Sequence, residues 1–253
     1  MPPILLRALL ADATDYRENS RMVTLLSAER GCISACAHNC RKAGAALLAA
    51  TQPLVCGEYE LHESRGRYTL RNCDITETFF PLRSSPKKYQ IALAITALAR
   101  AAAPEGLHCE NIFHLLLVTL SHLAYSQQHH EDLLIYFLTH FYRCAGHSPS
   151  LTQCAACQTD LRGAARLYFS PEQGGAVCAS CARLAMDATP TALEALRRVL
   201  LLPEGDIPKV VLKPELRAQI LRLLVAYGQR NGIGPERAYV LLQTPSRKEC
   251  SQP

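Results

Sequence analysis

Residues 151–183 read LTQCAACQTDLRGAARLYFSPEQGGAVCASCAR, and their four cysteines form the strongest local pattern in the chain. Cys154 and Cys157 make one Cys-x-x-Cys pair, and Cys178 and Cys181 make a second pair after twenty intervening residues. Each pair can hold a metal ion from a single tight turn, so two pairs supply the four sulfurs of a tetrahedral site. We therefore predict a Zn²⁺ module here. Free thiols, two disulfides or an iron site are the alternatives that the spacing leaves open.

The predicted zinc module is structural and not catalytic. A site closed by four thiolates leaves the metal no free position for a substrate or a water molecule. A zinc-dependent nuclease or deaminase would need such a position together with a nearby Glu or His. The chain also has no glycine-rich phosphate loop, no nucleophile elbow and no HExxH motif. We therefore predict that the protein is not an enzyme.

Helical periodicity surrounds the cysteine segment on both sides. Proline in the first turn marks three of the predicted helix starts. The predicted helices cover residues 85–103, a stretch from about residue 111, residues 132–144, residues 189–202 and a stretch from residue 213. In the last of these helices the apolar residues share one face, and Arg217 and Arg222 are expected to lie off it. A polar tail follows from Thr244.

Residues 3–80 follow a different period, because short β-branched and apolar segments alternate with turn-forming residues. The five strand-sized segments are residues 3–11, 21–26, 31–39, 53–61 and 67–75. Residues 12–19 are expected to form one of the turns. This pattern predicts a small barrel or sandwich. The fold class is therefore α+β and multidomain, with a β domain over residues 1–80 and an all-α domain over residues 81–253 that carries the cysteine module.

Composition excludes several classes of protein. The chain has 253 residues, of which 49% are hydrophobic and 19% charged, so a sizeable core can form and global disorder is excluded. No apolar run is long enough to span a membrane, and the N-terminus lacks the basic region of a signal peptide. Twelve cysteines without a signal peptide indicate thiols or metal ligands in a reducing compartment. We therefore expect a cytoplasmic protein. Cys32, Cys36 and Cys40 are interpreted as small buried side chains on one face of a strand.

Several short motifs follow one another at definite spacings. They are residues 15–26 (DYRENSRMVTLL), 31–35 (GCISA), 41–42 (RK), 52–54 (QPL), 68–71 (YTLR), 146–151 (GHSPSL) and 169–178 (FSPEQGGAVC). Their order and spacing, with the cysteine pairs, resemble the bacterial RecO family of DNA repair and recombination mediators. The resemblance covers about residues 5–183, and the helical pattern alone continues to about residue 230.

The resemblance implies an OB-fold in the N-terminal domain and an activity without covalent chemistry. RecO proteins bind single- and double-stranded DNA and anneal complementary strands. With RecR they help to load RecA on strands that single-strand-binding protein covers. The partners implied are DNA, RecR and the C-terminal tail of single-strand-binding protein, with RecF as a further candidate, and the implied location is the nucleoid. The alternative is a zinc-stabilised adaptor of the repair machinery with little DNA affinity of its own.

Arginine supplies 21 of the 27 cations, and arginine suits bidentate contact with phosphate. The net charge of the whole chain is +5, but residues 1–80 hold nine basic and nine acidic side chains. The predicted DNA contacts in the β domain are Arg17, Arg21, Arg41, Lys42, Arg67 and Arg71. A second group is expected to share the footprint from the helical domain: Arg162, Arg166, Arg183, Arg197, Arg198, Arg217 and Arg222. The chain has Cys32 and His38 where the family tends to have basic residues, which predicts a smaller contribution from the barrel.

Overall fold

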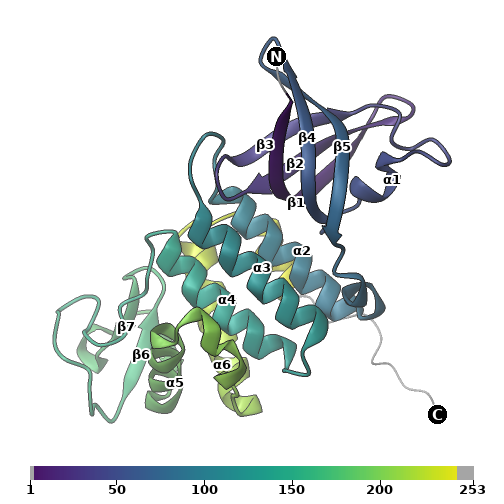
Figure 1. Cartoon of the computed structure of the whole chain (residues 1–253). Coiled ribbons are helices and arrows are strands. Elements are labelled where there is room, and N and C mark those ends of the chain that lie inside the picture. Colours follow the sequence, from purple (N-terminus) through teal and green to yellow (C-terminus); the bar gives the residue numbers. More distant parts are fainter. Residues whose placement is uncertain (1–2, 244–253) are drawn as a thin grey trace. The chain divides into compact units, whose positions relative to one another are not determined.

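A computed structural model describes residues 3–243 of the protein, so the predicted polar tail from Thr244 lies outside the described residues (Figure 1). The chain forms two compact units that divide between Leu120 and Ser121. The first unit holds the β domain and the helical segment that follows it. The predicted domain boundary at residue 80 therefore stays a prediction, and each unit is described by itself.

The first unit is built on a closed five-stranded barrel, which confirms the predicted OB-like architecture (Figure 1). The strands are β1 (Ile4–Tyr16), β2 (Ser20–Ser27), β3 (Gly31–Ala37), β4 (Cys56–Ser64) and β5 (Arg67–Glu77). They follow one another around the barrel in the order β1-β2-β3-β5-β4. All neighbours are antiparallel except β3 and β5, which are parallel and close the barrel. All five predicted strands are present.

The predicted turn over residues 12–19 is wrong in part, because only residues 17–19 form the turn between β1 and β2. Residues 12–16 continue β1 and pair with β2, from Asp12 opposite Thr24 to Tyr16 opposite Ser20. A register shift between Leu10 and Asp12 separates this half of the strand from its buried half. The Asp-rich sequence resembles a turn because these side chains point to solvent at the open end of the strand.

Alternating side chains fill the barrel, as the period of a strand requires. The inward residues are Leu6, Ala8, Leu10, Val23, Leu25, Ile33, Ala35, Ala37, Tyr59, Leu61 and Leu70. The prediction for the three cysteines of this region is wrong in part. Cys32 and Cys36 lie on the outer side of β3 and are half-buried, whereas Cys40 follows the strand and joins the buried core. The three thiols therefore do not share a face.

The rest of the first unit is helical. It comprises α1 (Leu47–Ala50), the 3₁₀ turn η1 (Phe80–Ser84), α2 (Pro86–Ala101) and most of α3 (Glu110–Tyr125). The Ser85 side chain caps α2 by accepting a hydrogen bond from the backbone N–H of Lys88, as the Ser-Pro start predicted. Arg100 of α2 forms an ion pair with Asp12 of β1. This contact ties the helix to the barrel.

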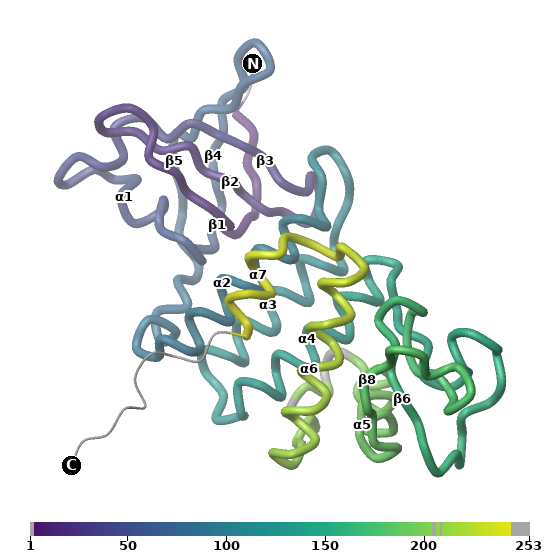
Figure 2. The backbone as a smooth tube through the Cα atoms, turned by 180° about the vertical axis from the view of Figure 1, so that it is seen from behind, coloured from purple at the N-terminus to yellow at the C-terminus, as the bar shows by residue number. Residues whose placement is uncertain are grey.

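The second unit combines helices with a small three-stranded sheet (Figure 2). Its elements are α4 (His130–Cys144), β6 (Leu167–Ser170), β7 (Gly175–Val177), η2 (Ala179–Cys181), β8 (Met186–Ala188), α5 (Pro190–Leu201), η3 (Glu204–Lys209), α6 (Pro214–Arg230) and α7 (Glu236–Gln243). Helix α6 packs against α4, α5 and α7. Helix α7 was not predicted. Among residues 3–243, no helix has both the length and the hydropathy that crossing a bilayer requires.

A buried ion pair joins α4 to α6 and corrects the prediction for Arg217. The Arg217 guanidinium donates to both carboxylate oxygens of Asp132, at 2.8 and 3.0 Å, and to the Leu212 carbonyl at 2.9 Å. Only 9% of Arg217 and 2% of Asp132 is exposed. Arg217 therefore lies inside the helix packing and not off the apolar face, and it is not available to DNA.

Breaking this pair is expected to destabilise the second unit strongly. Asp132→Ala leaves the Arg217 charge buried without its partner, which costs about 3–5 kcal/mol. The double variant Asp132→Leu/Arg217→Met removes both charges and is expected to recover most of that loss. Urea unfolding followed by circular dichroism measures both effects. Glu172→Gln, which breaks the exposed pair with Arg230, is the control and should cost at most about 1 kcal/mol.

Candidate nucleic-acid interface and metal centre

A groove of about 660 Å³ crosses the outside of the barrel. Its lining comes from the end of β1, from β2, β3 and the start of β5, and from the loop after α2. The lining residues are Tyr16, Arg17, Met22, Ser34, Cys36, His38, Gly66, Arg67, Tyr68, Thr69 and Glu105. We call this the barrel groove. In an OB-fold, this face and the loops after β1 and β4 are the usual place for an oligonucleotide.

The strand register explains why these residues meet. Thr14 of β1 lies opposite Met22 of β2, Met22 lies opposite Cys36 of β3, and Cys36 lies opposite Thr69 of β5. Because directly opposed residues point to the same side of a sheet, these four side chains form one outward row across four strands. None of the four carries a charge at neutral pH. Met22, Cys36 and Thr69 of this row line the groove, so its strand floor is uncharged.

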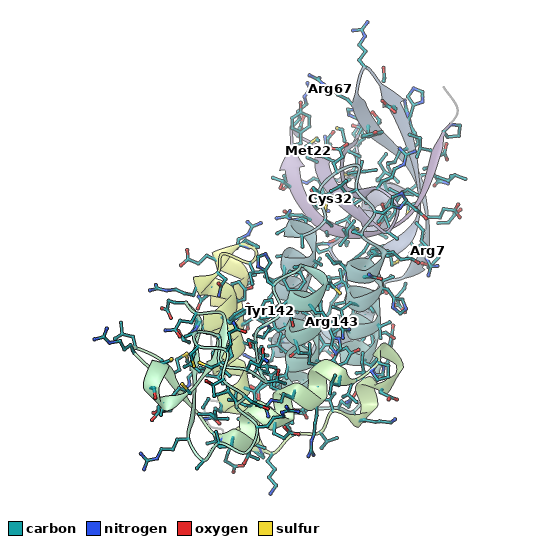
Figure 3. The ribbon with its side chains drawn as sticks, turned by 90° about the vertical axis from the view of Figure 1, so that its left-hand side faces the viewer. Arg7, Met22, Cys32, Arg67, Tyr142 and Arg143 are labelled. Carbon is teal, nitrogen blue, oxygen red and sulfur yellow. The ribbon has the colours of Figure 1, made fainter. Side chains whose placement is uncertain are left out.

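Two of the six predicted DNA contacts, Arg17 and Arg67, lie in the barrel groove. Arg17 sits in the turn after β1 with φ +55°, and its guanidinium lies 5.2 Å from the centre of the Tyr16 ring. Arg67 begins β5 after the turn that contains Gly66. Figure 3 shows Arg67 and Met22 on the same side of the barrel. The structure thus places a cation at each of the two loops that border the groove.

Arg21 and Arg41 have internal partners. The Arg21 Nε donates to Asp15 at 3.2 Å, and its Nη1 donates to the Thr51 carbonyl at 3.1 Å. Arg41 pairs with the other oxygen of the same Asp15 carboxylate at 3.1 Å. Lys42 and Arg71 are exposed and are not among the residues that line the groove. All six remain predicted contacts, but only Arg17 and Arg67 share one concave surface.

The opposite outer face of the barrel is acidic. Glu58 of β4 lies between Arg7 and Asp74, and Glu60 lies next to it on the same outward side. Figure 3 shows Arg7 on the other side of the barrel from Met22 and Arg67. Carboxylates repel phosphate, so the charge distribution disfavours DNA on this face and leaves the barrel groove as the better one.

The second candidate site is the cysteine quartet of the second unit. The sulfurs of Cys154, Cys157, Cys178 and Cys181 all lie within 4.8 Å of one another. The Cys157 and Cys178 sulfurs are 3.7 Å apart. Four thiolates at Zn–S bonds of about 2.3 Å would have sulfurs about 3.8 Å apart in a tetrahedron, so the quartet fits Zn²⁺. The fold brings together all four predicted ligands and can bind a metal ion there.

The protonation of the quartet also fits a cation. Thr159 lowers the pKa of the Cys157 thiol to about 6 through hydrogen bonds from its side chain and backbone. Burial alone would raise the pKa of Cys154, but the backbone N–H groups of Cys157, Cys178 and Ala156 together lower it. Hydrogen bonds with Cys178 and Cys157 raise the pKa of Cys181 to about 12. The lowered pKa values of Cys154 and Cys157 favour the thiolate, which is the form that binds a divalent cation.

A glycine pair supports the second knuckle, as its sequence predicted. Gly175 has φ +147°, and a Cβ on it would lie 2.2 Å from the Ser150 carbonyl oxygen. Only a residue without a side chain allows Ser150 to pair with β7 at this point. The Ala155 N–H then donates to the Ala176 carbonyl at 2.9 Å, which joins the two knuckles. Figure 2 shows β6 and β8 beside α5.

The arginines predicted around this module fall into three groups. Arg197 and Arg217 have internal roles: Arg197 donates to the Leu151 carbonyl at 2.6 Å and pairs with Glu194. Arg162 and Arg198 are exposed but form ion pairs with Asp160 and Glu194. Arg166 and Arg183 are exposed, and the Arg222 guanidinium donates to the Asp187 carbonyl at 3.4 Å.

Comparison with known proteins identifies the relatives of this chain. The family model "Recombination protein O N terminal" matches residues 1–79, and "Recombination protein O C terminal" matches residues 83–236. The DNA repair protein RecO of Pelotomaculum thermopropionicum is 32% identical over 223 residues, which cover 87% of this chain and 86% of that protein. That of Dehalococcoides mccartyi is 30% identical over 204 residues, covering 81% and 79%. This chain belongs to the RecO family of DNA repair proteins.

The motif resemblance is thereby confirmed over most of the RecO sequence. A further relative, the DNA repair protein RecO of Symbiobacterium thermophilum, is 31% identical over 217 residues, which cover 84% of this chain and 86% of that protein. What the motifs missed in this RecO chain is the uncharged part of the barrel groove, above all Tyr16, Met22 and Tyr68. The signal for Tyr16 and Met22 was their outward position in β1 and β2, which becomes readable only once the register is known. Tyr68 lies opposite the buried Ala35 and packs partly against the core.

Removing one ligand of the quartet is expected to release the metal and loosen the module. Wild-type protein should contain one Zn²⁺ per chain, and Cys154→Ser should lose it and lower solubility and Tm before it lowers DNA affinity. The physical reason is that structural zinc supplies about 10–16 kcal/mol of apparent binding energy to a segment with little core. Elemental analysis, thermal melting and DNA titration measure the three effects. Cys32→Ser is the control, and an equally stable Cys154→Ser protein that no longer binds DNA would contradict the structural role.

Proposed function

We propose that this RecO chain is a recombination mediator that acts on DNA in the cytoplasm. In this proposal it binds single- and double-stranded DNA, anneals complementary strands and, with RecR, helps to load RecA on strands covered by single-strand-binding protein. RecF is a further candidate partner. The observation that carries the proposal is the barrel groove, which has Arg17 and Arg67 at its two bordering loops.

The groove supports DNA binding on physical grounds. Two arginines at the edges of an uncharged floor can hold the phosphates of a strand that crosses the barrel. Binding of this kind depends on counterion release, so it should weaken steeply as salt rises. Annealing needs only that two strands are brought together with part of their charge neutralised. It requires no bond to be made or broken by the protein.

The metal belongs to the scaffold in this proposal. Cys154, Cys157, Cys178 and Cys181 would hold Zn²⁺ with four thiolates, which leaves no position for a substrate. Zinc bound there would supply folding energy to the segment between α4 and α5. The closed ligand set supports a function in binding over one in catalysis.

Strand annealing tests the main proposal. Two complementary labelled oligonucleotides, first naked and then covered by the cognate single-strand-binding protein, should anneal faster with this protein, and the acceleration should fade as salt rises. For Arg17→Gln/Arg67→Gln, the salt slope of single-strand binding should fall by about 1.4, because each phosphate contact contributes about 0.7.

Arg230→Gln/Arg237→Gln, which removes two exposed charges from the second unit outside the barrel groove, is the control for a general loss of charge. A folded, metal-loaded wild-type protein that fails to accelerate annealing of either substrate would reject the mediator function. The zinc-stabilised protein–protein adaptor would then be the function to test.

A second groove, in the second unit, supports an adaptor function in addition to DNA binding. Within the second unit, α5, residues 209–213 and the start of α6 surround about 550 Å³. Its apolar walls include Leu202, Val211 and Leu216, and 78% of Val211 is exposed. The cations at this groove are Arg198, Lys209 and Lys213. An apolar groove with a cationic rim suits an acidic peptide with an apolar anchor, so we place the tail of single-strand-binding protein here.

Lys213 is the residue that tests this placement. Arg198 and Lys209 pair with Glu194 and Asp206, whereas within the described part of the chain Lys213 has no acidic partner. Lys213→Glu should weaken binding of a labelled tail peptide about tenfold, or roughly 1.4 kcal/mol, measured by fluorescence anisotropy. Arg183→Glu, exposed in the same unit but outside the groove, is the matched control. Equal loss in both variants would point to general charge attraction.

A further inference from the structure

We propose that the barrel groove takes the bases of a single strand on its floor, with Tyr16 as the stacking residue, so that the barrel discriminates single strands from duplex. This inference rests on the proposed function and deepens it. It assigns different parts of DNA to different parts of the groove: phosphates to the arginine-bearing loops and bases to the sheet between them.

The strand floor of the groove offers phosphates no charge attraction. His38 lines the groove beyond the end of β3, so the strand surface itself is formed by the outward row of Met22, Cys36 and Thr69, with Ser34 beside it. None of these four strand side chains offers a positive charge. The Cys36 thiol has a pKa raised from its ordinary value by burial, so it stays neutral as well. A surface of this composition offers van der Waals contact to base faces and hydrogen bonds to base edges.

An acidic residue also restricts where the phosphates of a strand can lie at the groove. Glu105, in the loop after α2, also lines the groove. The loop is held against the barrel, because the Cys32 N–H donates to the Ala103 carbonyl at 3.0 Å and the Gly106 N–H donates to the Arg30 carbonyl at 3.0 Å. A carboxylate on this border repels a phosphate chain that would enter over it. The two arginines thus mark where the backbone of a strand can run.

Tyr16 is placed to stack on a base. It is the last residue of β1, its side chain lies on the same outward side as Thr14, and 39% of the residue is exposed. The Arg17 guanidinium lies over its ring at 5.2 Å, which orients the ring next to the cation that would hold the neighbouring phosphate. Tyr68 lines the same groove but also packs against the barrel core, so Tyr16 has the more accessible ring.

This arrangement favours single strands for a geometric reason. Stacking needs a base whose face is free, and in a duplex both faces of each base are covered by its neighbours. A duplex could offer its phosphates to Arg17 and Arg67 but could not offer base faces to Tyr16. Duplex binding should therefore depend on the cations alone, whereas single-strand binding should depend on the cations and on the ring.

The test compares Tyr16→Ala with Tyr16→Phe in the full chain. Affinity is measured by fluorescence anisotropy for an oligothymidine, for a duplex of the same length and for a strand of abasic sites. Tyr16→Ala should weaken oligothymidine binding about 5- to 150-fold, the range for loss of one base–aromatic stack. Duplex and abasic-strand binding should change less than about twofold, because neither presents a free base face. Tyr16→Phe should keep wild-type affinity.

Three controls separate the possible outcomes. Arg17→Gln should weaken all three ligands and reduce the salt slope, whereas Tyr16→Ala should leave the slope unchanged. Ile75→Ala removes a side chain of nearly equal exposure, 40%, from β5 outside the groove and should change nothing. If Tyr16→Ala weakens binding of oligothymidine, duplex and abasic strand equally, or weakens none of them, the stacking role of Tyr16 is overturned. The proposed DNA-binding function of the protein would still stand. Wild-type protein that binds no DNA would instead reject the proposed function.

Discussion

The parallel pairing of β3 with β5 is the contact on which the barrel and its groove depend. It is short, with Ala35 opposite Tyr68 and Cys36 opposite Thr69, yet it closes the sheet. Closure removes the free edges that a five-stranded sheet would otherwise expose to solvent. It also brings the turn after β1 and the turn after β4 to the two borders of one surface. Without it, Arg17 and Arg67 would not border the same groove.

Several arginines of this protein form ion pairs with aspartates within the fold and are less available to bind DNA. Asp15 holds both Arg21 and Arg41, Asp132 holds Arg217, and Asp12 holds Arg100. Of these pairs, Asp132–Arg217 is buried, so removing one partner there would leave a charge without compensation. The pairs of Asp15 and Asp12 are more exposed and contribute less to stability, but they occupy the guanidinium groups. A count of arginines therefore overstates the cations that DNA can reach. Exposed arginines without a carboxylate partner among the residues that the structure describes, such as Arg17 and Arg67 at the barrel groove, are therefore the better candidates for DNA contacts.

The barrel and the cysteine segment between α4 and α5 are stabilised in different ways. The barrel buries a continuous set of apolar side chains, from Leu6 on β1 to Leu70 on β5. The segment between α4 and α5 has only three short strands, and its four sulfurs converge where a core would otherwise be needed. A metal ion can replace apolar burial because its binding energy becomes folding energy. This explains why the cysteine spacing is readable in sequence although the fold around it is irregular.

Sequence alone determined what depends on neighbours along the chain. Alternation revealed the five strands, Ser85-Pro86 and Thr189-Pro190 located two helix starts, and the cysteine pairs located four sulfurs that could hold a metal ion, because each pattern lies within a few residues. Only the tertiary structure decided which residues from distant segments face one another. The register that aligns Met22, Cys36 and Thr69, and the burial of Arg217 against Asp132, join positions 14 to 85 residues apart. No local period records such distances, since they depend on how strands close and helices pack.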